Sequence, residues 1–592
     1  MTAFHRLALL LSLPLSGLLA CSCGSSESTE PVPDQADPAA IAEQAHAPTM
    51  IDVPTPGAPI SDLEAVENLT EEVADWLLTL SDKFRKREFS AAEAWFGDDF
   101  WGHDIGELAL AQTTTDHLDL EQRSYDASAA NIVNRPAFMN GWRDRIGAWG
   151  RVDSMIWKVK GANFQAGRGT RWGRIKLLVH ATGELNGGNI ALNSWGWLRV
   201  EKPPGQKSWS IKRFQLTSLD EQFRKAQLFT DVSTSTGIAH TGIRFGKPGN
   251  QSFSWNGAAA GDVNGDGMWD LFVPSDGRNY FYLAQADGTY SEQAEARGMA
   301  QPAMGTGAVF FDFDNDRDQD LAVGHEGWRD ADGRLFGHTI QLYENDGEGN
   351  FSERSESLGF VEGLSAFSLT VLDYDADGWL DLFVCGYGRV AVEHNNSWIE
   401  ATNGDVNALY HNVEGKRFKE VAEEAGIAGN SWSYASISAD LDRDGHMDLY
   451  VANDYGSNQV WLGDGKGSFR NGAHELGLTD RGNGMGINLG DLDGDAKLDV
   501  YVSNMSSTAG NRILSRLTEE IDEEVHAQLK KLAAGNSIFL RRDEKFERVP
   551  KAAGGIGANW AWSTALADFD LDGRLDVYCA NGYVTGDLPF DT

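Results

Sequence analysis

Short apolar runs rich in Val, Phe and Tyr recur six times in the last two thirds of the chain. They read DLFVPSD, DLAVGHE, DLFVCGY, DLYVAND, DVYVSNM and DVYCANG, starting at Asp270, Asp320, Asp381, Asp448, Asp499 and Asp576. Each run is short and stops at Asn, Gly or Asp, which is typical of a buried strand that ends at a turn. The pattern therefore predicts a repeated β-structure with one such strand in every unit.

Residues 61–225 follow a different pattern. Leu63 to Arg87 has one apolar stripe at helical spacing, and a second helix is expected around Arg135 to Trp149. Strand-like runs follow at Met155 to Phe164, Trp172 to Leu185, Ile190 to Val200 and Ser208 to Leu216. Helices followed by an antiparallel meander resemble the cone-shaped α+β fold of the nuclear transport factor 2-like family. Trp172, His180, Trp195 and Trp197 alternate along the strands and are expected either in the core or lining a pocket of the cone.

The N-terminus has the pattern of an export signal. A short polar start is followed by the apolar run Leu7 to Leu19 and by Ala20-Cys21. This resembles the lipobox of bacterial lipoproteins, so residues 1–20 are expected to be a signal peptide and Cys21 the lipidated first residue. A plain secretory signal is the alternative. Residues 21–60 are rich in Ser, Glu, Pro and Ala and are expected to be a disordered tether.

An acidic nonapeptide leads into each apolar run, and its last aspartate is the first residue of that run. The first, Asp262 to Asp270, reads D-x-N-x-D-G-x-x-D, with oxygen-bearing side chains at positions 1, 3, 5 and 9 of a tight turn. This spacing suits Ca²⁺, which prefers six to eight oxygen ligands, and a glycine at position 6 permits the sharp bend. An EF-hand would need Glu at position 12 and a helix on both sides. Position 12 is instead Val273, Val323, Val384, Val451, Val502 or Cys579, within an expected strand.

Each repeat from about residue 226 onwards contains further common features. A strand-turn segment such as IQLYENDGEGNF follows the apolar run, and an aromatic-led segment ending in glycine, such as FSERSESLGF, closes the unit. Four strands per unit in tandem predict a β-propeller. Residues 229–592 resemble the FG-GAP/VCBS repeat family, the integrin-α-like propellers, and within it the cartilage acidic protein-like branch with its bacterial members. The expected fold is mainly β: residues 226–592 form a propeller of six to seven four-stranded blades with Ca-binding hairpin loops, after a smaller N-terminal α+β domain.

The resemblance implies up to six structural Ca²⁺ ions. Their ligands would be Asp262, Asn264, Asp266 and Asp270; Asp312, Asp314, Asp316 and Asp320; Asp373, Asp375, Asp377 and Asp381; Asp440, Asp442, Asp444 and Asp448; Asp491, Asp493, Asp495 and Asp499; and Asp568, Asp570, Asp572 and Asp576. Two loops carry Arg317 and Ala496 at position 6, where a left-handed turn costs on the order of 1 kcal/mol, so weaker binding is expected there.

Two features of the last blades depart from the common pattern. The stretch Ser503 to Asn536 inserts a helix near Thr518 to Leu532, expected over one face of the ring. The last blade has two clear strands. Either the segment from Phe229 supplies its outer strand, or the ring is short of a blade.

Charge and composition limit the functions that the chain can have. A net charge of −38 argues against nucleic acid as a partner, and four scattered cysteines predict no disulfide framework. We expect a lipoprotein of the bacterial cell envelope, at the outer membrane or cell surface, that contacts the membrane only through its anchor and binds a protein or glycan. Aromatic residues could form the ligand face or fill the blade interfaces: Trp255, Trp269, Trp379, Trp432, Trp560 and Trp562.

An enzyme is the main alternative to a binding module. Glycan lyases and hydrolases can use the central channel of a propeller, and the N-terminal cone could hold a catalytic pocket. The sequence has no G-x-S-x-G or H-E-x-x-H motif and its histidines share no register within the repeats, so catalytic residues are not predicted. A scaffold within an envelope complex is a further alternative.

Overall fold

The computed structural model describes residues 57–581 except 117, 240–256, 276–277, 301–304, 326–327, 330–334, 337–339, 361–363, 389–393, 507–509, 511–513, 515–521 and 551–559. The chain divides into two compact units between Thr230 and Asp231. Among the described residues, no helix combines the length and the apolar character needed to cross a membrane. The predicted signal peptide, Cys21 and most of the tether lie outside the described residues.

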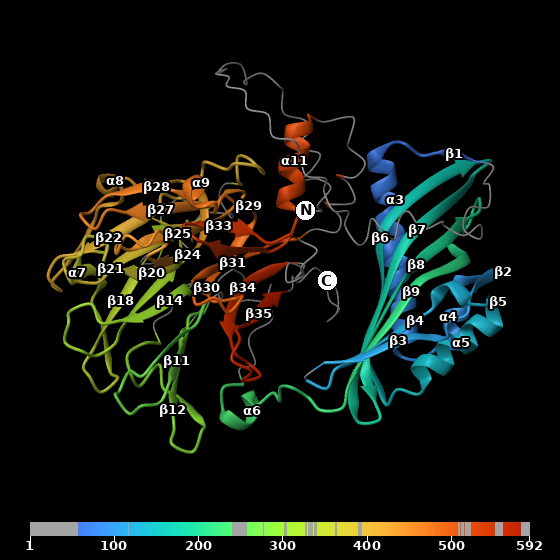
Figure 1. Cartoon of the computed structure of the whole chain (residues 1–592), viewed down its shortest axis with the longest axis horizontal. Helices are drawn as coiled ribbons and strands as arrows, with labels where there is room; N and C mark the ends of the chain where they lie inside the picture. The colour runs from blue at the N-terminus through green and yellow to red at the C-terminus, as the bar shows by residue number, and fades with distance from the viewer. Residues whose placement is uncertain are drawn as a thin grey trace. The chain divides into compact units, whose positions relative to one another are not determined.

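The first unit is an α+β domain built on one nine-stranded sheet (Figure 1). The sheet order is β1-β6-β7-β8-β9-β2-β5, with β4 also paired to β9 and β3 paired to β4. Its elements are β1 (Ala58–Pro59), α3 (Leu63–Arg85), α4 (Phe89–Ala92), β2 (Phe96–His103), β3 (Leu110–Thr115), β4 (Glu121–Tyr125), β5 (Ile132–Asn134), α5 (Arg135–Gly147), β6 (Arg151–Gly167), β7 (Thr170–Leu185), β8 (Gly188–Lys202) and β9 (Ser210–Arg224). The two helices and the four long strands expected from the sequence are all present, and the shorter strands β1 to β5 are additional.

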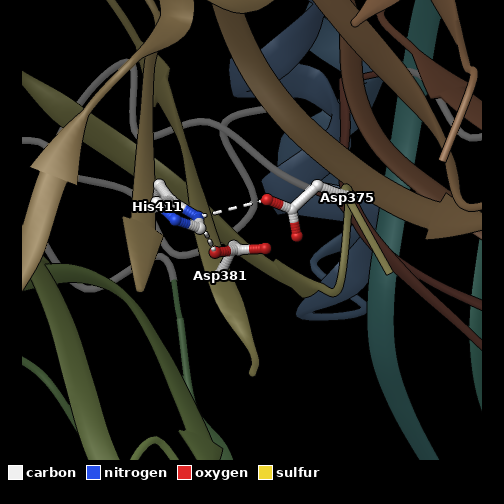
Figure 2. A group of neighbouring side chains, drawn as sticks. All are labelled: Asp375, Asp381 and His411. Atoms are coloured by element: carbon white, nitrogen blue, oxygen red, sulfur yellow. Dashed lines mark hydrogen bonds and ion pairs between the residues drawn. The ribbon is translucent and has the colours of Figure 1, made fainter. Parts of the chain in front are cut away.

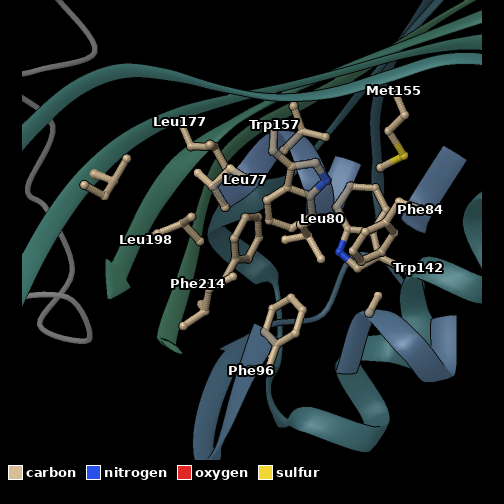
Figure 3. Close-up of a cluster of buried hydrophobic side chains, with 14 of the residues drawn as sticks. Leu77, Leu80, Phe84, Phe96, Trp142, Met155, Trp157, Leu177, Leu198 and Phe214 are labelled. Atoms are coloured by element: carbon tan, nitrogen blue, oxygen red, sulfur yellow. The ribbon is translucent and has the colours of Figure 1, made fainter. Parts of the chain in front are cut away.

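Helix α3 is stabilised by an N-terminal cap and by the burial of its apolar stripe. The side chain of Asp62 accepts a hydrogen bond from the Ala65 amide at the N-terminus, which satisfies one of the first free amides. The apolar stripe then faces the sheet and buries Val73, Leu77 and Leu80 completely. Figure 3 shows this core, in which Trp142 of α5 and Trp157 of β6 meet with ring centroids 5.5 Å apart.

The two expectations for the strand aromatics were both wrong. Trp157, Val179 and Leu198 face the core, whereas Trp172, His180, Trp195 and Trp197 occupy the alternate positions of the same sheet. Successive side chains of a strand point to opposite faces, so these four lie on the face away from the helices. They are half-buried and neither fill the core nor line the interior of the domain.

The second unit contains the six repeats as six successive antiparallel sheets. Five of them have four strands, in the orders β10-β11-β12-β13, β14-β15-β18-β19, β20-β21-β22-β23, β24-β25-β27-β28 and β30-β31-β32-β33, and the sixth, β34-β35, has two among the described residues. The strands are β10 (Ala259–Gly261), β11 (Asp270–Val273), β12 (Tyr280–Ala284), β13 (Tyr290–Glu292), β14 (Gly305–Phe311), β15 (Asp320–His325), β18 (Ile340–Asn345), β19 (Phe351–Glu353), β20 (Ala366–Leu372), β21 (Asp381–Gly386), β22 (Ala408–Asn412), β23 (Phe418–Glu420), β24 (Trp432–Ala439), β25 (Asp448–Asp454), β27 (Gln459–Gly463), β28 (Phe469–Asn471), β30 (Gly484–Gly490), β31 (Asp499–Asn504), β32 (Ser537–Arg542), β33 (Lys545–Arg548), β34 (Ala561–Ala567) and β35 (Asp576–Asn581).

The sheets are arranged as the blades of a β-propeller, as predicted. The first strands of successive sheets lie against one another, β10 by β14, β14 by β20, β20 by β24, β24 by β30 and β30 by β34. Apolar clusters fill the space between neighbouring sheets, for example Leu382 and Tyr410 with Ala322 and Leu342 of the preceding one. Burial between blades, which no single sheet can achieve alone, therefore holds the unit together.

In the described part of the chain, four short helical turns accompany the blades; one precedes the first sheet and the other three each follow the outer strand of a sheet. They are α6 (Ser233–Thr236), α7 (Ser355–Leu358), α8 (Ala422–Ala425) and α9 (Ala473–Leu476). Gly237 after α6 approaches the backbone of Tyr290 in β13, just as Gly359 after α7 approaches Phe418 in β23. The segment from Phe229 thus packs against the first blade in the way that other closing segments pack against the blade that follows them.

Additional elements decorate the blades. Two small two-stranded sheets pair β16 (Trp328–Arg329) with β17 (Leu335–Phe336), and β26 (Gly456–Ser457) with β29 (Arg481–Gly482). The predicted inserted helix is present as α11 (Glu523–Leu532) and contacts β29. Cys385 is a free, fully buried thiol, and Cys579 is free and half-buried. Burial raises the pKa of the Cys385 thiol to about 12, so it behaves as a small apolar side chain.

Candidate metal centres

Each acidic loop connects the first strand of its sheet to the second. In the first loop, Asp262 at position 1 accepts hydrogen bonds from the amides of Asp266 (3.0 Å) and Gly267 (2.9 Å), and Asp266 at position 5 accepts one from Met268 (2.9 Å). The same three contacts recur in the other five loops. The backbone amides therefore hold the carboxylates of positions 1 and 5 on the inner side of every turn.

The aspartate at position 9 is the first residue of the second strand, and in the first five loops it is fully buried. Asp320 accepts a hydrogen bond from the Phe313 amide at position 2 (3.2 Å) and another from the Asn345 amide in the third strand (2.9 Å). Equivalent pairs of contacts occur at Asp270, Asp381, Asp448 and Asp499. The position 9 side chain thus fixes the loop to two strands of its own sheet.

Three or more ligand atoms converge in most of the loops. Groups whose ligand atoms all lie within 4.8 Å of one another are Asp312, Asp314 and Asp316; Asp373, Asp375 and Asp377; Asp440, Asp442 and Asp448; and Asp491, Asp493 and Asp499. All 24 residues expected as ligands lie in these six loops, at the ends of β10, β14, β20, β24, β30 and β34. The donors are hard carboxylate and amide oxygens, which fit Ca²⁺.

The electrostatics of the clusters favour a bound positive charge. Burial, followed by the nearby carboxylates of Asp314 and Asp318, raises the pKa of Asp320 to about 8. Burial and the neighbouring Asp442 raise the pKa of Asp448 to about 6, although backbone amides act in the opposite direction. Without a cation these carboxylates therefore tend to take up protons, and a divalent ion would relieve the same repulsion.

The third loop has an additional candidate nitrogen ligand that the sequence did not predict. Figure 2 shows His411 of β22 beside Asp375 and Asp381, with Nδ1 at 3.6 Å and 3.2 Å from their carboxylate oxygens. The three ligand atoms lie within 4.8 Å of one another. The histidines shared no register in the sequence, and this one is placed by the strand pairing of Leu382 with Tyr410.

The fifth loop contains its own cations. Lys497 at position 7 lies 2.9 Å from Asp495, and Arg542 of β32 lies 2.7 Å from Asp493. The hydrogen bond from Lys497 lowers the pKa of Asp495. These two side chains would compete with a metal ion for the same carboxylates, so the fifth loop differs from the first in charge as well as in having Ala496 at position 6.

The loops need left-handed backbone at two positions. Position 6 has φ between 61° and 92° in all six loops, including Arg317 (80°) and Ala496 (61°). Position 4 is also left-handed in every loop, and it is occupied by Gly265, Asn315, Ala376, Arg443, Gly494 and Leu571. The sequence motif marks only position 6, because glycine is frequent there, and gives no sign of the strain at position 4.

Side chains from the following blade close over several loops. Asn345 of β18 donates to the carbonyl of Val263 in the first loop (2.8 Å), and Arg541 of β32 donates to the carbonyl of Leu441 in the fourth. Gly349 and Gly467, in the turns after β18 and β27, approach the loops of the preceding blades. Each of these loops is therefore part of the seam between two sheets. An Asn at the end of the third strand, in IQLYEN and ALYHN, was the sequence signal for this role.

Comparison with known proteins agrees with this architecture. Three stretches of the chain match the FG-GAP-like repeat family, at residues 262–323, 330–384 and 440–502. The chain contains FG-GAP-like repeats. The first match begins at Asp262 of the first loop and the last ends at Val502, three residues after Asp499 of the fifth.

Relatives of the FG-GAP-like region include a curated mammalian protein. Cartilage acidic protein 1 of Mus musculus is 22% identical over 352 residues, which cover 55% of this chain and 48% of that protein. The chain thus spans about half the length of this relative. Among solved structures, an Agrocybe aegerita lectin that recognises non-reducing terminal N-acetylglucosamine is 15% identical with a TM-score of 0.31, covering 54% of this chain and 72% of the lectin. The Dos1 propeller is 8% identical with a TM-score of 0.23, covering 52% and 63%.

Proposed function

We propose that the FG-GAP-like propeller is a calcium-stabilised interaction module that binds a protein or glycan outside the cell. The observation that carries this proposal is the repeated convergence of buried and half-buried carboxylates, each fixed by backbone amides, at one end of the sheets. Burying unpaired carboxylates together is costly, and a structural cation offsets that cost. Calcium bound to the folded loops would add its binding energy to the stability of the propeller.

The face for a partner, on this proposal, lies at the strand ends opposite the acidic loops. Strand β24 runs from Trp432 to the fourth loop, so Trp432 lies at the far end, where its ring is 5.5 Å from that of Tyr455. Trp398 packs on Tyr455 at 5.1 Å, and Arg481 pairs with Glu400 at 2.8 Å. Trp432 itself is almost fully buried, so it supports this face and does not contact a ligand directly.

The position of the protein in the cell is a further part of the proposal. The N-terminal pattern ending at Cys21 supports export and lipid attachment, with the propeller held away from the membrane by the tether. Metabolic labelling with a palmitate analogue tests this, since Cys21→Ser should abolish the label and leave the protein otherwise intact. Labelling that persists in C21S would count against the anchor.

Thermal unfolding with and without calcium tests the central claim. Removing calcium with EDTA should lower the melting temperature of the propeller, and excess Ca²⁺ should restore it. When free calcium is 100 times the dissociation constant of a site, binding at that site adds about 2.7 kcal/mol to the free energy of unfolding. Mg²⁺ at the same concentration is the control, because its octahedral geometry suits these loops poorly. A propeller transition that does not move with EDTA would refute structural calcium.

A further inference from the structure

The sheet of the N-terminal unit has a basic face on the side away from its helices. We define the basic face by Lys158, Arg174, Lys176, Trp197, Arg199 and Arg213. All six are half-buried and lie on the four long strands β6, β7, β8 and β9. The residues between them, such as Trp157 and Leu198, point into the core on the opposite side (Figure 3).

Strand register brings the charges of the basic face together. Arg174 pairs with Arg199, and Arg199 pairs with Arg213, so three arginine residues lie in one row across three neighbouring strands. Like charges placed directly opposite each other destabilise a sheet. In agreement with this, burial and then the charge of Arg213 lower the pKa of Arg199. The fold therefore concentrates positive charge here, within a chain whose net charge is −38.

Aromatic rings lie among these cations. The guanidinium of Arg174 stacks over the ring of Trp197 with its carbon 4.4 Å from the ring centroid, and Lys176 pairs with Trp197 in register. Trp195 precedes Trp197 by two residues on the same face, and pairs with Leu178 of β7. The face thus combines flat apolar surfaces with cationic groups on both sides of them.

We infer that the basic face binds an acidic polysaccharide. Arginine recognises carboxylate and sulfate groups in a bidentate manner, and indole rings present flat surfaces against which the C–H faces of sugar rings pack. A gently curved sheet face admits an extended chain of such units. This inference concerns the N-terminal unit and depends neither on calcium nor on the ligand of the propeller.

Two other occupants fit the basic face less well. A second copy would bring the same row of arginines against itself, which is electrostatically unfavourable in a two-fold interface. A nucleic acid also stacks on aromatic rings, but its high charge density would be repelled more strongly by the acidic remainder of the chain.

Titration of the whole protein with defined oligomers tests the inference. The probes are a galacturonic acid oligomer, a neutral maltose oligomer of the same length and a single-stranded oligonucleotide, measured by calorimetry at low and at physiological salt. The test variants are K176Q/R199Q and W197A. The control is R168Q/K207Q, which removes the same charge from two exposed turn residues. Circular dichroism melts show whether each variant is folded.

The acidic oligomer should bind, and K176Q/R199Q should weaken its binding about tenfold at low salt. W197A should weaken it as well, whereas R168Q/K207Q should stay within about twofold of the parent. The inference is wrong if the neutral oligomer binds equally, if the control variant loses as much affinity, or if no acidic oligomer binds. It is also wrong if the oligonucleotide binds more tightly and depends on the same residues, or if the protein is a dimer that K176Q/R199Q dissociates.

Discussion

The side-chain amide of Asn412 donates a hydrogen bond of 2.7 Å to the carbonyl oxygen of Phe313, 99 residues earlier in the chain. The same amide group also donates to Leu380 at 3.0 Å. Phe313 belongs to the acidic loop of the second blade and Leu380 to that of the third. One fully buried asparagine therefore satisfies a carbonyl in each of two neighbouring loops and fastens the seam between their blades.

Replacing this asparagine should destabilise the propeller. Asn412→Ala leaves the buried carbonyl oxygen of Phe313 and the partly buried one of Leu380 without this donor, and such a loss at a buried group costs about 1–3 kcal/mol. We expect a fall of about 2–4 kcal/mol in the free energy of unfolding, measured by urea denaturation. Asn350→Ala removes an exposed amide that bonds only within its own turn and should cost less than about 1 kcal/mol. Equal effects of the two changes would contradict a special role for the seam.

The cations of the fifth loop should weaken its calcium binding. Lys497 and Arg542 neutralise Asp495 and Asp493, so K497Q/R542Q should increase the number of calcium ions bound at a given concentration or raise the affinity of one site. Calorimetric titration of the calcium-free protein measures both quantities. Lys416→Gln serves as the control, because Lys416 pairs with Glu414 in an exposed turn. An unchanged isotherm for K497Q/R542Q would show that these cations do not compete.

Arg317 should be a point of backbone strain in the second loop. Its φ of 80° costs a residue with a Cβ atom about 1 kcal/mol more than it costs glycine. Arg317→Gly should therefore raise the stability of the propeller by up to about 1 kcal/mol, a shift that thermal unfolding detects. Arg317→Lys keeps the strain and should leave the melting temperature unchanged. Destabilisation by R317G would mean that the arginine side chain contributes more than its backbone costs.

The stability of the calcium-free protein should decrease as the pH rises above 4. Burial raises the pKa of Asp320 from 3.8 to about 8 and that of Asp448 to about 6. A raised pKa means that the folded state binds the proton more tightly than the unfolded chain does. These carboxyls therefore contribute their full stabilisation below about pH 4 and lose it between about pH 4 and pH 8.

Melting temperatures in EDTA at pH 5, 6, 7 and 8 would test this dependence. Excess calcium should reduce the fall, because the ion then compensates the charge that the proton compensates at low pH. Asp320→Asn should also flatten the profile in EDTA. A melting temperature that increases across this range in EDTA would contradict the prediction.

The periodic parts of the fold were predictable from the sequence because each rests on local chemistry. The acidic spacing from Asp262 to Asp270 specifies a tight turn, and the apolar run that follows specifies a buried strand, so the loops and the propeller were predicted together. Helix α3 was predicted from its apolar stripe in the same way. The domain boundaries and the calcium ligands themselves stay predictions.

The unpredicted features depend on contacts between distant segments. His411 reaches the third loop only because β22 pairs with β21, and Arg542 reaches the fifth through the pairing of β32 with β31. Trp195 and Trp197 were misassigned because alternation along a strand shows that two faces differ and does not show which face the helices cover. The helices pack on the face that contains Trp157 and Leu198, so Trp195 and Trp197 lie on the opposite face.

The hydrogen bonds from third strands to the loops of neighbouring blades run in the same direction along the chain. Asn345, Asn412 and Arg541 each reach back to the loop of the blade before their own. Loss of one repeat would therefore deprive its predecessor's loop of a bridging donor and leave its successor's donor without its acceptor. Deleting an internal repeat would thus disturb both neighbouring blades in different ways, the preceding one by a missing donor and the following one by a missing acceptor.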